Sequence, residues 1–95
     1  MSMKKLSTVE VEQRLGQLPD WTLDEGKLYR HFVFNNFLEA FGFMTQVAML
    51  AETLNHHPEW SNVWSRVEIH LTTHDCGGIS ELDFELAGRI NTLLG

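Results

Sequence analysis

Three histidines and two carboxylates lie close together in the second half of the chain. Glu52 is followed by the run His56-His57-Pro58, and His74 and Asp83 come later in the sequence. Histidine is the one side chain whose ordinary pKa lies near neutral pH, so a cluster of histidines can both donate and accept protons within one turnover. This density of titratable groups predicts an enzyme that uses acid/base chemistry.

Glu52 and His56 are four positions apart. If a helix continues as far as His56, the two side chains share one helix face and the carboxylate can orient the imidazole. The same spacing is also typical of an ordinary surface pair. The run His56-His57-Pro58 is more specific, because the proline stiffens a short connection from which two imidazoles project; ordinary loop histidines are the alternative.

His74 and Asp83 each have a functional and a structural interpretation. His74 comes at the end of an expected strand and enters the loop Asp75-Cys76-Gly77-Gly78, where a functional side chain or a solvent-facing one is equally typical. Asp83 is expected at the third position of a helix. There the helix dipole and the capping geometry favour a carboxylate whatever the function.

A zinc site is the alternative chemistry for such a set of side chains, since imidazole and carboxylate are legitimate zinc ligands. The spacing argues against it, because adjacent His56 and His57 on an extended connection point in different directions. The lone Cys76 excludes a zinc site with several cysteines, and it also excludes an internal disulfide. His31 and His70 fall in the middle of expected strands and are interpreted as surface or packing residues.

The bulk properties predict one small domain over residues 1–95. The hydrophobic fraction is 43% and the net charge is −6, with the basic residues scattered along the chain. Scattered basic residues in an acidic protein argue against direct nucleic-acid binding. No stretch approaches the length of a membrane-spanning helix, and no secretory signal is visible, so we expect a cytoplasmic protein that is also compatible with the nucleus.

The first half of the chain predicts a helix, a hairpin and a long helix. Ser7 with Glu10 forms a capping-box pattern before a helix over Thr8–Leu15. Strands are expected over 21–23 and 27–34, joined by a turn at 24–26. Asn36 is an N-cap for the main helix over Phe37–Leu54, whose apolar arc is wider than one packing face requires. That surplus is either core filling or a surface for another subunit.

The second half predicts a strand and a third helix. Apolar and polar residues alternate over 64–74, with Val67, Ile69 and Leu71 on one face. A weaker signal at 59–62 suggests a short partner strand. Ser80 and Asp83 repeat the capping-box pattern before a helix that reaches residue 94. Strands in adjacent pairs predict an α+β fold, a two-layer sandwich with a four-stranded antiparallel sheet and helices on one face.

A longer pattern joins these residues. The chain contains the series Glu52-x3-His56-His57-Pro58-x5-Trp64-x9-His74-x8-Asp83, extended by Phe41-Gly42-Phe43-Met44, His57-Pro58-Glu59-Trp60, Thr73-His74 and Gly78-Ile79-Ser80. Together these closely resemble the signature of the pterin-4a-carbinolamine dehydratases. The resemblance covers nearly the whole chain, and Pro58 and Trp64 take structural places in the motif.

The resemblance implies removal of water from 4a-hydroxytetrahydrobiopterin, giving the quinonoid dihydropterin that is recycled after aromatic amino-acid hydroxylation. It implies that His56 and His74 are the acid/base pair, with the assignment of acid and base left open, and that His57 holds substrate or assists proton transfer. Glu52 and Asp83 orient these imidazoles or tune their proton affinity. The remaining expected pterin contacts flank the histidines: Asn55, Thr72, Thr73 and Asp75.

The resemblance also implies which groups the protein does and does not need. No metal or cofactor is expected, because dehydration moves only protons and water and the pterin is the substrate. Members of the family form homodimers and homotetramers. Animal relatives also act as dimerisation cofactors of a homeodomain transcription factor, so a helix-binding coactivator module without essential catalysis is the alternative function.

Overall fold

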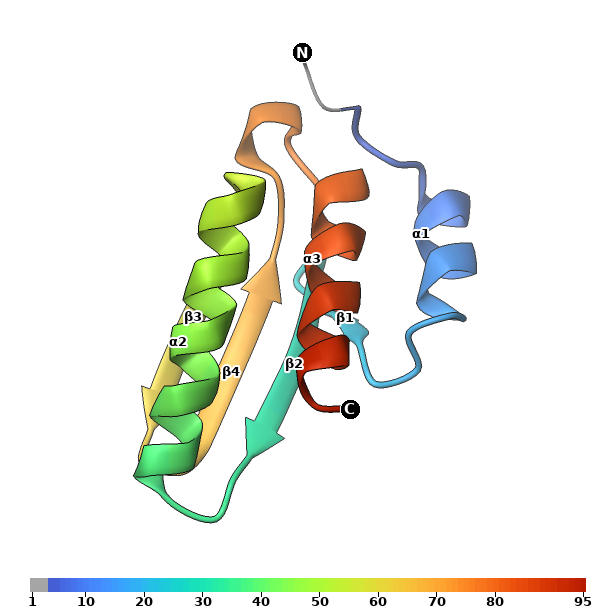
Figure 1. The fold of residues 1–95 in the computed structure, drawn as a ribbon. Helices are drawn as coiled ribbons and strands as arrows, with labels where there is room; N and C mark the ends of the chain where they lie inside the picture. Colours follow the sequence, from blue (N-terminus) through green and yellow to red (C-terminus); the bar gives the residue numbers. More distant parts are fainter. Residues whose placement is uncertain (1–3) are drawn as a thin grey trace.

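The computed structural model describes residues 4–95 and arranges them in two layers (Figure 1). Helices α2 and α3 lie side by side on one face of a four-stranded antiparallel sheet, and α1 lies on the other side of α3 from α2. The elements are α1 (Thr8–Leu15), β1 (Thr22–Asp24), β2 (Lys27–Val33), α2 (Phe37–Leu54), β3 (Glu59–Val63), β4 (Arg66–Leu71), the 3-10 turn η1 (His74–Cys76) and α3 (Glu81–Leu93). The predicted α+β sandwich is confirmed.

The strand order in the sheet is β1-β2-β4-β3, so β2 and β3 both pair with β4. Val67, Ile69 and Leu71 of β4 are fully buried against the helices, which confirms the predicted alternation. Within residues 4–95, no helix covers the other face of the sheet (Figure 1). We call this the outer face. Successive side chains of a strand point to opposite faces, so the residues on either side of each buried β4 residue belong to the outer face. Lys27 of β2 and Glu59 of β3 belong to it for the same reason.

The helix starts are fixed by the caps that the sequence predicts. The Ser7 hydroxyl accepts the Glu10 N–H and the Glu10 carboxylate accepts the Ser7 N–H, which completes a capping box. Asn36 Oδ1 accepts the Glu39 N–H at the start of α2. Each such cap satisfies a helix N–H that has no partner inside the helix, so α1 and α2 begin where these side chains stand.

Several strand boundaries differ from those expected from the sequence. The strand expected over 64–74 is only Arg66–Leu71, because Trp64 and Ser65 form the turn of the β3–β4 hairpin. Trp64 has a φ of 48°, and Asn62 Nδ2 holds the turn by donating to the Trp64 and Arg66 carbonyls. The predicted strand was too long at both ends, because side-chain alternation does not reveal where the backbone turns before Arg66 and after Leu71.

The first hairpin is also tighter than expected. Its loop is the pair Glu25-Gly26, and both residues have positive φ, at 53° and 77°. Two positive φ angles match the right-handed twist of the flanking strands, which is why such two-residue loops are common in hairpins. Asp24 therefore belongs to β1, not to the turn, and the strand expected over 21–23 is shifted by one residue.

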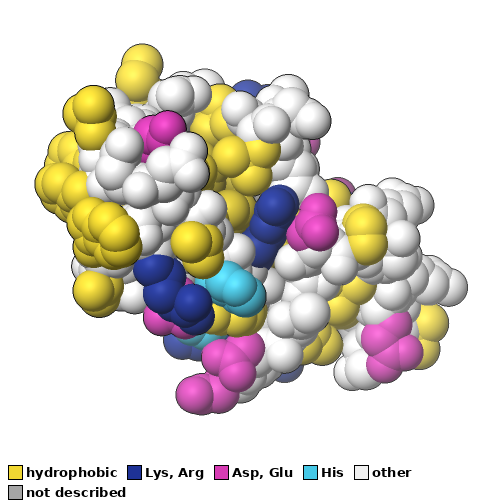
Figure 2. Space-filling view, turned by 90° about the horizontal axis from the view of Figure 1, so that it is seen from below, with side chains coloured by type: hydrophobic (Ala, Val, Ile, Leu, Met, Phe, Trp, Pro, Cys, Tyr) yellow, Lys and Arg dark blue, Asp and Glu magenta, His cyan; other side chains and the backbone are white. Residues whose placement is uncertain are grey.

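The surplus apolar arc of α2 is exposed. Phe37, Leu38, Phe41 and Met49 are 49%, 81%, 55% and 67% exposed. Figure 2 shows hydrophobic side chains gathered on the side of the molecule where α2 lies. Val33 and Val63, at the ends of β2 and β3, and Trp64, in the turn after β3, are exposed as well. The ends of these strands lie near the start of α2 (Figure 1). Within residues 4–95, no helix has the length and apolar character needed to cross a membrane.

Candidate active site

The way in which α2 ends directs the His56 side chain toward the protein interior. Asn55 adopts the left-handed conformation, with φ 51° and ψ 43°, and ends the helix. The His56 N–H then donates to the Ala51 carbonyl at 3.0 Å, a bond that satisfies one of the last helix carbonyls. As a result the chain folds back under the helix, and the His56 side chain is only 10% exposed.

Asp83 holds His56 from the first turn of α3. The Asp83 carboxylate is completely buried, and its Oδ1 lies 2.5 Å from His56 Nε2. Its Oδ2 accepts the Thr73 hydroxyl at 2.8 Å and the Ser80 N–H at 2.9 Å. The Ser80 and Thr73 hydroxyl oxygens are 2.7 Å apart, which closes the network.

This network fixes the chemistry of the His56 ring. An ionised carboxylate only accepts hydrogen bonds, so the His56 nitrogen facing Asp83 carries the proton. The other ring nitrogen, Nδ1, is then the one that can exchange a proton with another group. A buried carboxylate that orients an imidazole and stabilises its protonated form is a recurrent device of acid/base enzymes.

His57 faces the opposite way and meets Glu52. Its Nε2 lies 2.8 Å from Glu52 Oε1, and the two side chains are 59% and 81% exposed. The expected pairing of Glu52 with His56 through a shared helix face is wrong. The helix ends at Leu54 and Asn55 is left-handed, so His56 leaves the face that carries Glu52.

His74 belongs to a third pair. It begins η1 instead of ending a strand as predicted, and its side chain is 79% exposed. Its Nε2 lies 3.0 Å from Glu59 Oε2, while Glu59 Oε1 accepts from Lys27 Nζ at 2.6 Å. The hydrogen bond from Lys27 lowers the pKa of the Glu59 carboxyl, and the same bond raises the pKa of Lys27. Glu59 is therefore ionised at neutral pH.

The remaining predicted contacts occupy different surroundings. Asn55 and Asp75 are exposed beside His56 and His74. Thr72 lies on the outer face, whereas Thr73 is buried, with its hydroxyl, N–H and carbonyl all bonded within the protein. Thr73 thus supports Asp83 and does not present its hydroxyl to solvent. Pro58 is half-buried and Trp64 is 66% exposed.

Sequence reasoning missed Glu59 and Lys27 as members of the site. The available signal was that Glu59 directly follows Pro58 and that strand alternation puts it on the outer face with Lys27.

Sequence reasoning also missed a second cluster on the outer face. His70 Nε2 lies 2.8 Å from Asp24 Oδ2, and the His70 ring packs against the Tyr29 ring. The Tyr29 hydroxyl donates to Glu68 at 2.6 Å. That bond raises the pKa of Tyr29 and lowers that of Glu68.

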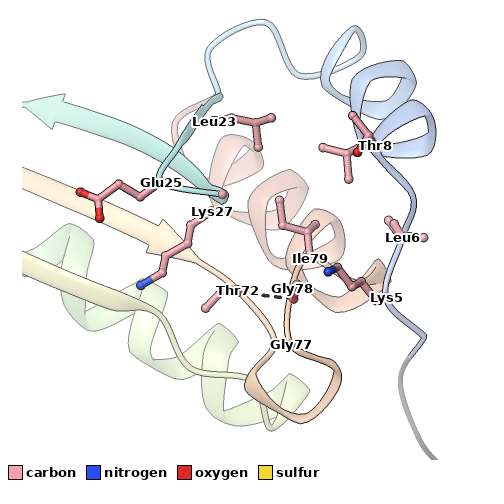
Figure 3. A pocket seen from close by; sticks show the side chains of 12 residues that line it. Lys5, Leu6, Thr8, Leu23, Glu25, Lys27, Thr72, Gly77, Gly78 and Ile79 are labelled. Carbon is pink, nitrogen blue, oxygen red and sulfur yellow. Dashed lines mark hydrogen bonds between the residues drawn. The ribbon is translucent and has the colours of Figure 1, made fainter.

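A cavity of about 410 Å³ lies beside the loop that carries His74 (Figure 3). Its apolar wall includes Leu6, Leu23 and Ile79 from three separate segments, and Lys27 and Thr72 contribute polar side chains. Thr72 is the one sequence-predicted site residue that lines it. The three candidate histidines lie outside this lining, so the cavity borders the candidate site without containing its histidines.

No group of three or more histidine, cysteine, aspartate or glutamate side chains within residues 4–95 is arranged to hold a metal ion. The arrangement instead consists of separate imidazole–carboxylate pairs. Cys76 is half-buried with its Sγ 3.5 Å from the Thr73 and Gly78 carbonyls.

Comparisons with known proteins agree on one family. The family described as Pterin 4 alpha carbinolamine dehydratase matches residues 4–93. A protein of Prochlorococcus marinus is 50% identical over 98% of this chain and 97% of its own length, and one of a Chelativorans species is 53% identical over 96% and 95%. Both carry the provisional name of a pterin-4-alpha-carbinolamine dehydratase. The crystal structure of a transcriptional coactivator/pterin dehydratase from Brucella melitensis is similar, with 40% identity, a TM-score of 0.92, and coverage of 97% of this chain and 100% of that one.

Proposed function

Because this chain belongs to the pterin 4 alpha carbinolamine dehydratase family, we propose that it is a hydro-lyase that removes water from 4a-hydroxytetrahydrobiopterin. The product is the quinonoid dihydropterin, which tetrahydrobiopterin recycling consumes. The observation that carries the proposal is the buried bond between His56 and Asp83, because a buried carboxylate that orients an imidazole recurs in acid/base sites, whereas the capping role of Asp83 requires no histidine.

The reaction needs one acid and one base. The bond between C4a and the hydroxyl oxygen breaks, the oxygen keeps the electron pair, and an acid protonates it so that it leaves as water. A base removes a proton from a ring nitrogen, and the released electron pair forms the new carbon–nitrogen double bond. Atoms and electrons balance without any oxidant or reductant, so no metal or prosthetic group is required.

His56 and His74 are assigned to these two proton transfers, and His57 to holding the substrate. His56 keeps one ring nitrogen on Asp83 and has Nδ1 left for exchange, while His74 keeps one ring nitrogen on Glu59. His57 is exposed and is held by Glu52, which suits an auxiliary role. Positioned general acids and bases each typically contribute about 100- to 10,000-fold to a rate.

The test measures how fast the purified protein converts freshly generated 4a-hydroxytetrahydropterin to the quinonoid form. His56→Ala and His74→Ala are each expected to lower kcat by about 100-fold or more while the circular dichroism spectrum stays that of the folded protein. His31→Ala is the matched control, because His31 lies on the outer face, where it pairs with Glu68 and neighbours the Tyr29 ring. Near wild-type turnover in a folded His56 or His74 variant removes that histidine from the mechanism.

A second candidate function is supported by the exposed apolar side chains of α2. Phe37, Leu38, Phe41 and Met49 form a surface that suits a second copy of the chain or an amphipathic helix, giving a homodimer or homotetramer. The Brucella melitensis structure is described as that of a transcriptional coactivator as well as a dehydratase. A coactivator module for a homeodomain transcription factor, in the cytoplasm or nucleus, would capture such a helix even when both His56 and His74 are replaced by alanine.

A further inference from the structure

His74 is held in place by one side chain. Its ring is 79% exposed and stands on a 3-10 turn of three residues, whereas the His56 ring is 10% exposed and packed beneath α2. Within residues 4–95, the hydrogen bond of the His74 ring is the one to Glu59 Oε2, at 3.0 Å. An exposed imidazole on a short turn rotates freely unless a neighbour restrains it.

Glu59 is itself fixed from two directions. It is the first residue of β3 and pairs with His70 of β4, so its backbone is part of the sheet. Lys27 reaches across β4 from β2, and its Nζ donates to Glu59 Oε1 at 2.6 Å. Each carboxylate oxygen thus has its own partner, and the oxygen that faces His74 cannot turn away without breaking the bond to Lys27.

We propose that Glu59 is a positioning residue that selects the His74 tautomer with the proton on Nε2, and that Lys27 holds the Glu59 carboxylate in the orientation this requires. An ionised carboxylate accepts from Nε2–H, which leaves the lone pair of Nδ1 for proton exchange with the substrate. The catalytic part of this inference rests on the proposed dehydratase function. The tautomer does not, because it is a property of the resting protein.

The charged groups around Glu59 agree with this arrangement. Lys27 and His74 contact it directly, and His70 is its neighbour on β4 and is itself held by Asp24. Glu25 lies near Lys27 in the hairpin turn and adds a second negative charge beside the ammonium group. Lys27 thus remains protonated and available to Glu59 throughout the neutral range.

A structural alternative is that Lys27 and Glu59 only link β2 to β3, with His74 touching the pair incidentally. Both interpretations expect some loss of stability when Glu59 is replaced. They differ in the protonation pattern of the His74 ring, which an incidental contact would leave unchanged. The discriminating readout is therefore the ring nitrogen chemical shifts, which distinguish the two neutral tautomers and the imidazolium.

The experiment records these shifts for His74 in the full-length, ¹⁵N-labelled protein across neutral pH. The wild type is expected in the Nε2–H form. Glu59→Ala should give a mixture of both tautomers, and Glu59→Gln should shift the preference toward the Nδ1–H form, because Lys27 takes the single amide oxygen and leaves the amide nitrogen to donate to His74 Nε2. Glu68→Gln is the control, since Glu68 is an outer-face carboxylate that bonds Tyr29 and Arg66 instead of His74.

Activity supplies the second readout. Glu59→Ala is expected to lower kcat by about 10- to 100-fold with KM nearly unchanged, and Glu59→Gln to lower kcat by at least as much, because its amide nitrogen favours the Nδ1–H tautomer. A wild-type His74 in the Nδ1–H form, or a Glu59→Ala variant with unchanged tautomer and unchanged pH profile, overturns the inference. If the tautomer responds as expected but the wild-type protein dehydrates no pterin, Glu59 positions His74 and the proposed dehydratase function is wrong.

Discussion

Asp83 is the residue whose replacement should affect both the fold and the site most strongly. Asp83→Ala leaves the His56 ring, the Thr73 hydroxyl and the Ser80 N–H without their acceptor in a region that water does not reach. Removing one partner of a buried charged pair typically costs about 3–5 kcal/mol of the free energy of unfolding. For a domain of this size, each kcal/mol shifts Tm by about 4–8 °C, so we expect Tm to fall by roughly 12–40 °C.

Asp83→Asn separates the two roles of the carboxylate. The asparagine side chain keeps one oxygen for Ser80 and Thr73, so the start of α3 survives and the loss of stability should be about 1–3 kcal/mol. Its amide nitrogen, however, donates toward His56 Nε2 and forces the proton of the neutral ring onto Nδ1. That tautomer is the wrong one for exchange at Nδ1, so kcat should fall at least about 100-fold in a protein that remains folded.

The assay is urea unfolding followed by circular dichroism, together with initial rates of dehydration. Glu81→Gln is the matched control, because Glu81 is a carboxylate in the same first turn of α3 but pairs with Arg14 at the surface. Exposed ion pairs contribute about 1 kcal/mol or less, so this variant should stay close to wild type. If Asp83→Ala loses no more stability than Glu81→Gln, the buried network does not hold α3 and the reasoning is refuted.

Three further predictions concern the residues around the site. Asn55→Gly should leave the free energy of unfolding, measured by thermal melts, unchanged or slightly raised. Asn55→Ala should lower this free energy by about 1 kcal/mol, because an alanine is strained at positive φ and a glycine is not. Equal melts for the two variants would contradict a left-handed cap. The bond between Glu59 and Lys27 lowers the pKa of Glu59 and raises the pKa of Lys27, from ordinary values of 4.5 and 10.5. The bond therefore stabilises the protein fully at any pH between these two ordinary values. The stabilisation is lost as pH falls through the pKa of Glu59 in the folded protein, or rises through that of Lys27. A Lys27→Met variant should therefore differ from wild type in unfolding free energy at pH 7 but converge with it at both extremes; a difference that does not vary with pH would show that the bond is not its source. Leu38→Glu should lower the molar mass measured by light scattering if α2 faces a second copy, while Val9→Glu, on exposed α1, should not; an unchanged mass for Leu38→Glu would rule out that face.

The parts of the fold that depend on neighbouring residues could be predicted from the sequence. The bounds of α1 and α2 follow from Ser7, Asn36 and the residues three positions later, and the buried face of β4 follows from alternation. The ends of β4 could not be predicted from alternation, because the count of every second residue can be carried back to Trp64 although its backbone has already turned. A pattern of side chains reports which face is buried and does not report φ.

The partners of the site residues could not be predicted in the same way. His56 and Asp83 are 27 positions apart and meet only because α2 and α3 pack side by side on the sheet. Glu59 and Lys27 meet because β2 and β3 flank β4, an order that no local pattern specifies. Glu52, which lies four positions before His56 as in a helical pair, is the partner of His57 instead of His56.

One consequence of the Asp83 network concerns amide hydrogen exchange. The Ser80 N–H donates to the same carboxylate oxygen that accepts the Thr73 hydroxyl, and that carboxylate also holds His56. This amide can exchange with solvent only when the start of α3 opens, and that opening releases His56 at the same moment. The exchange rate at Ser80 therefore reports how often the contact between His56 and Asp83 opens in the native protein, without any substrate present. A ligand that binds the closed site should slow this one amide in proportion to its occupancy.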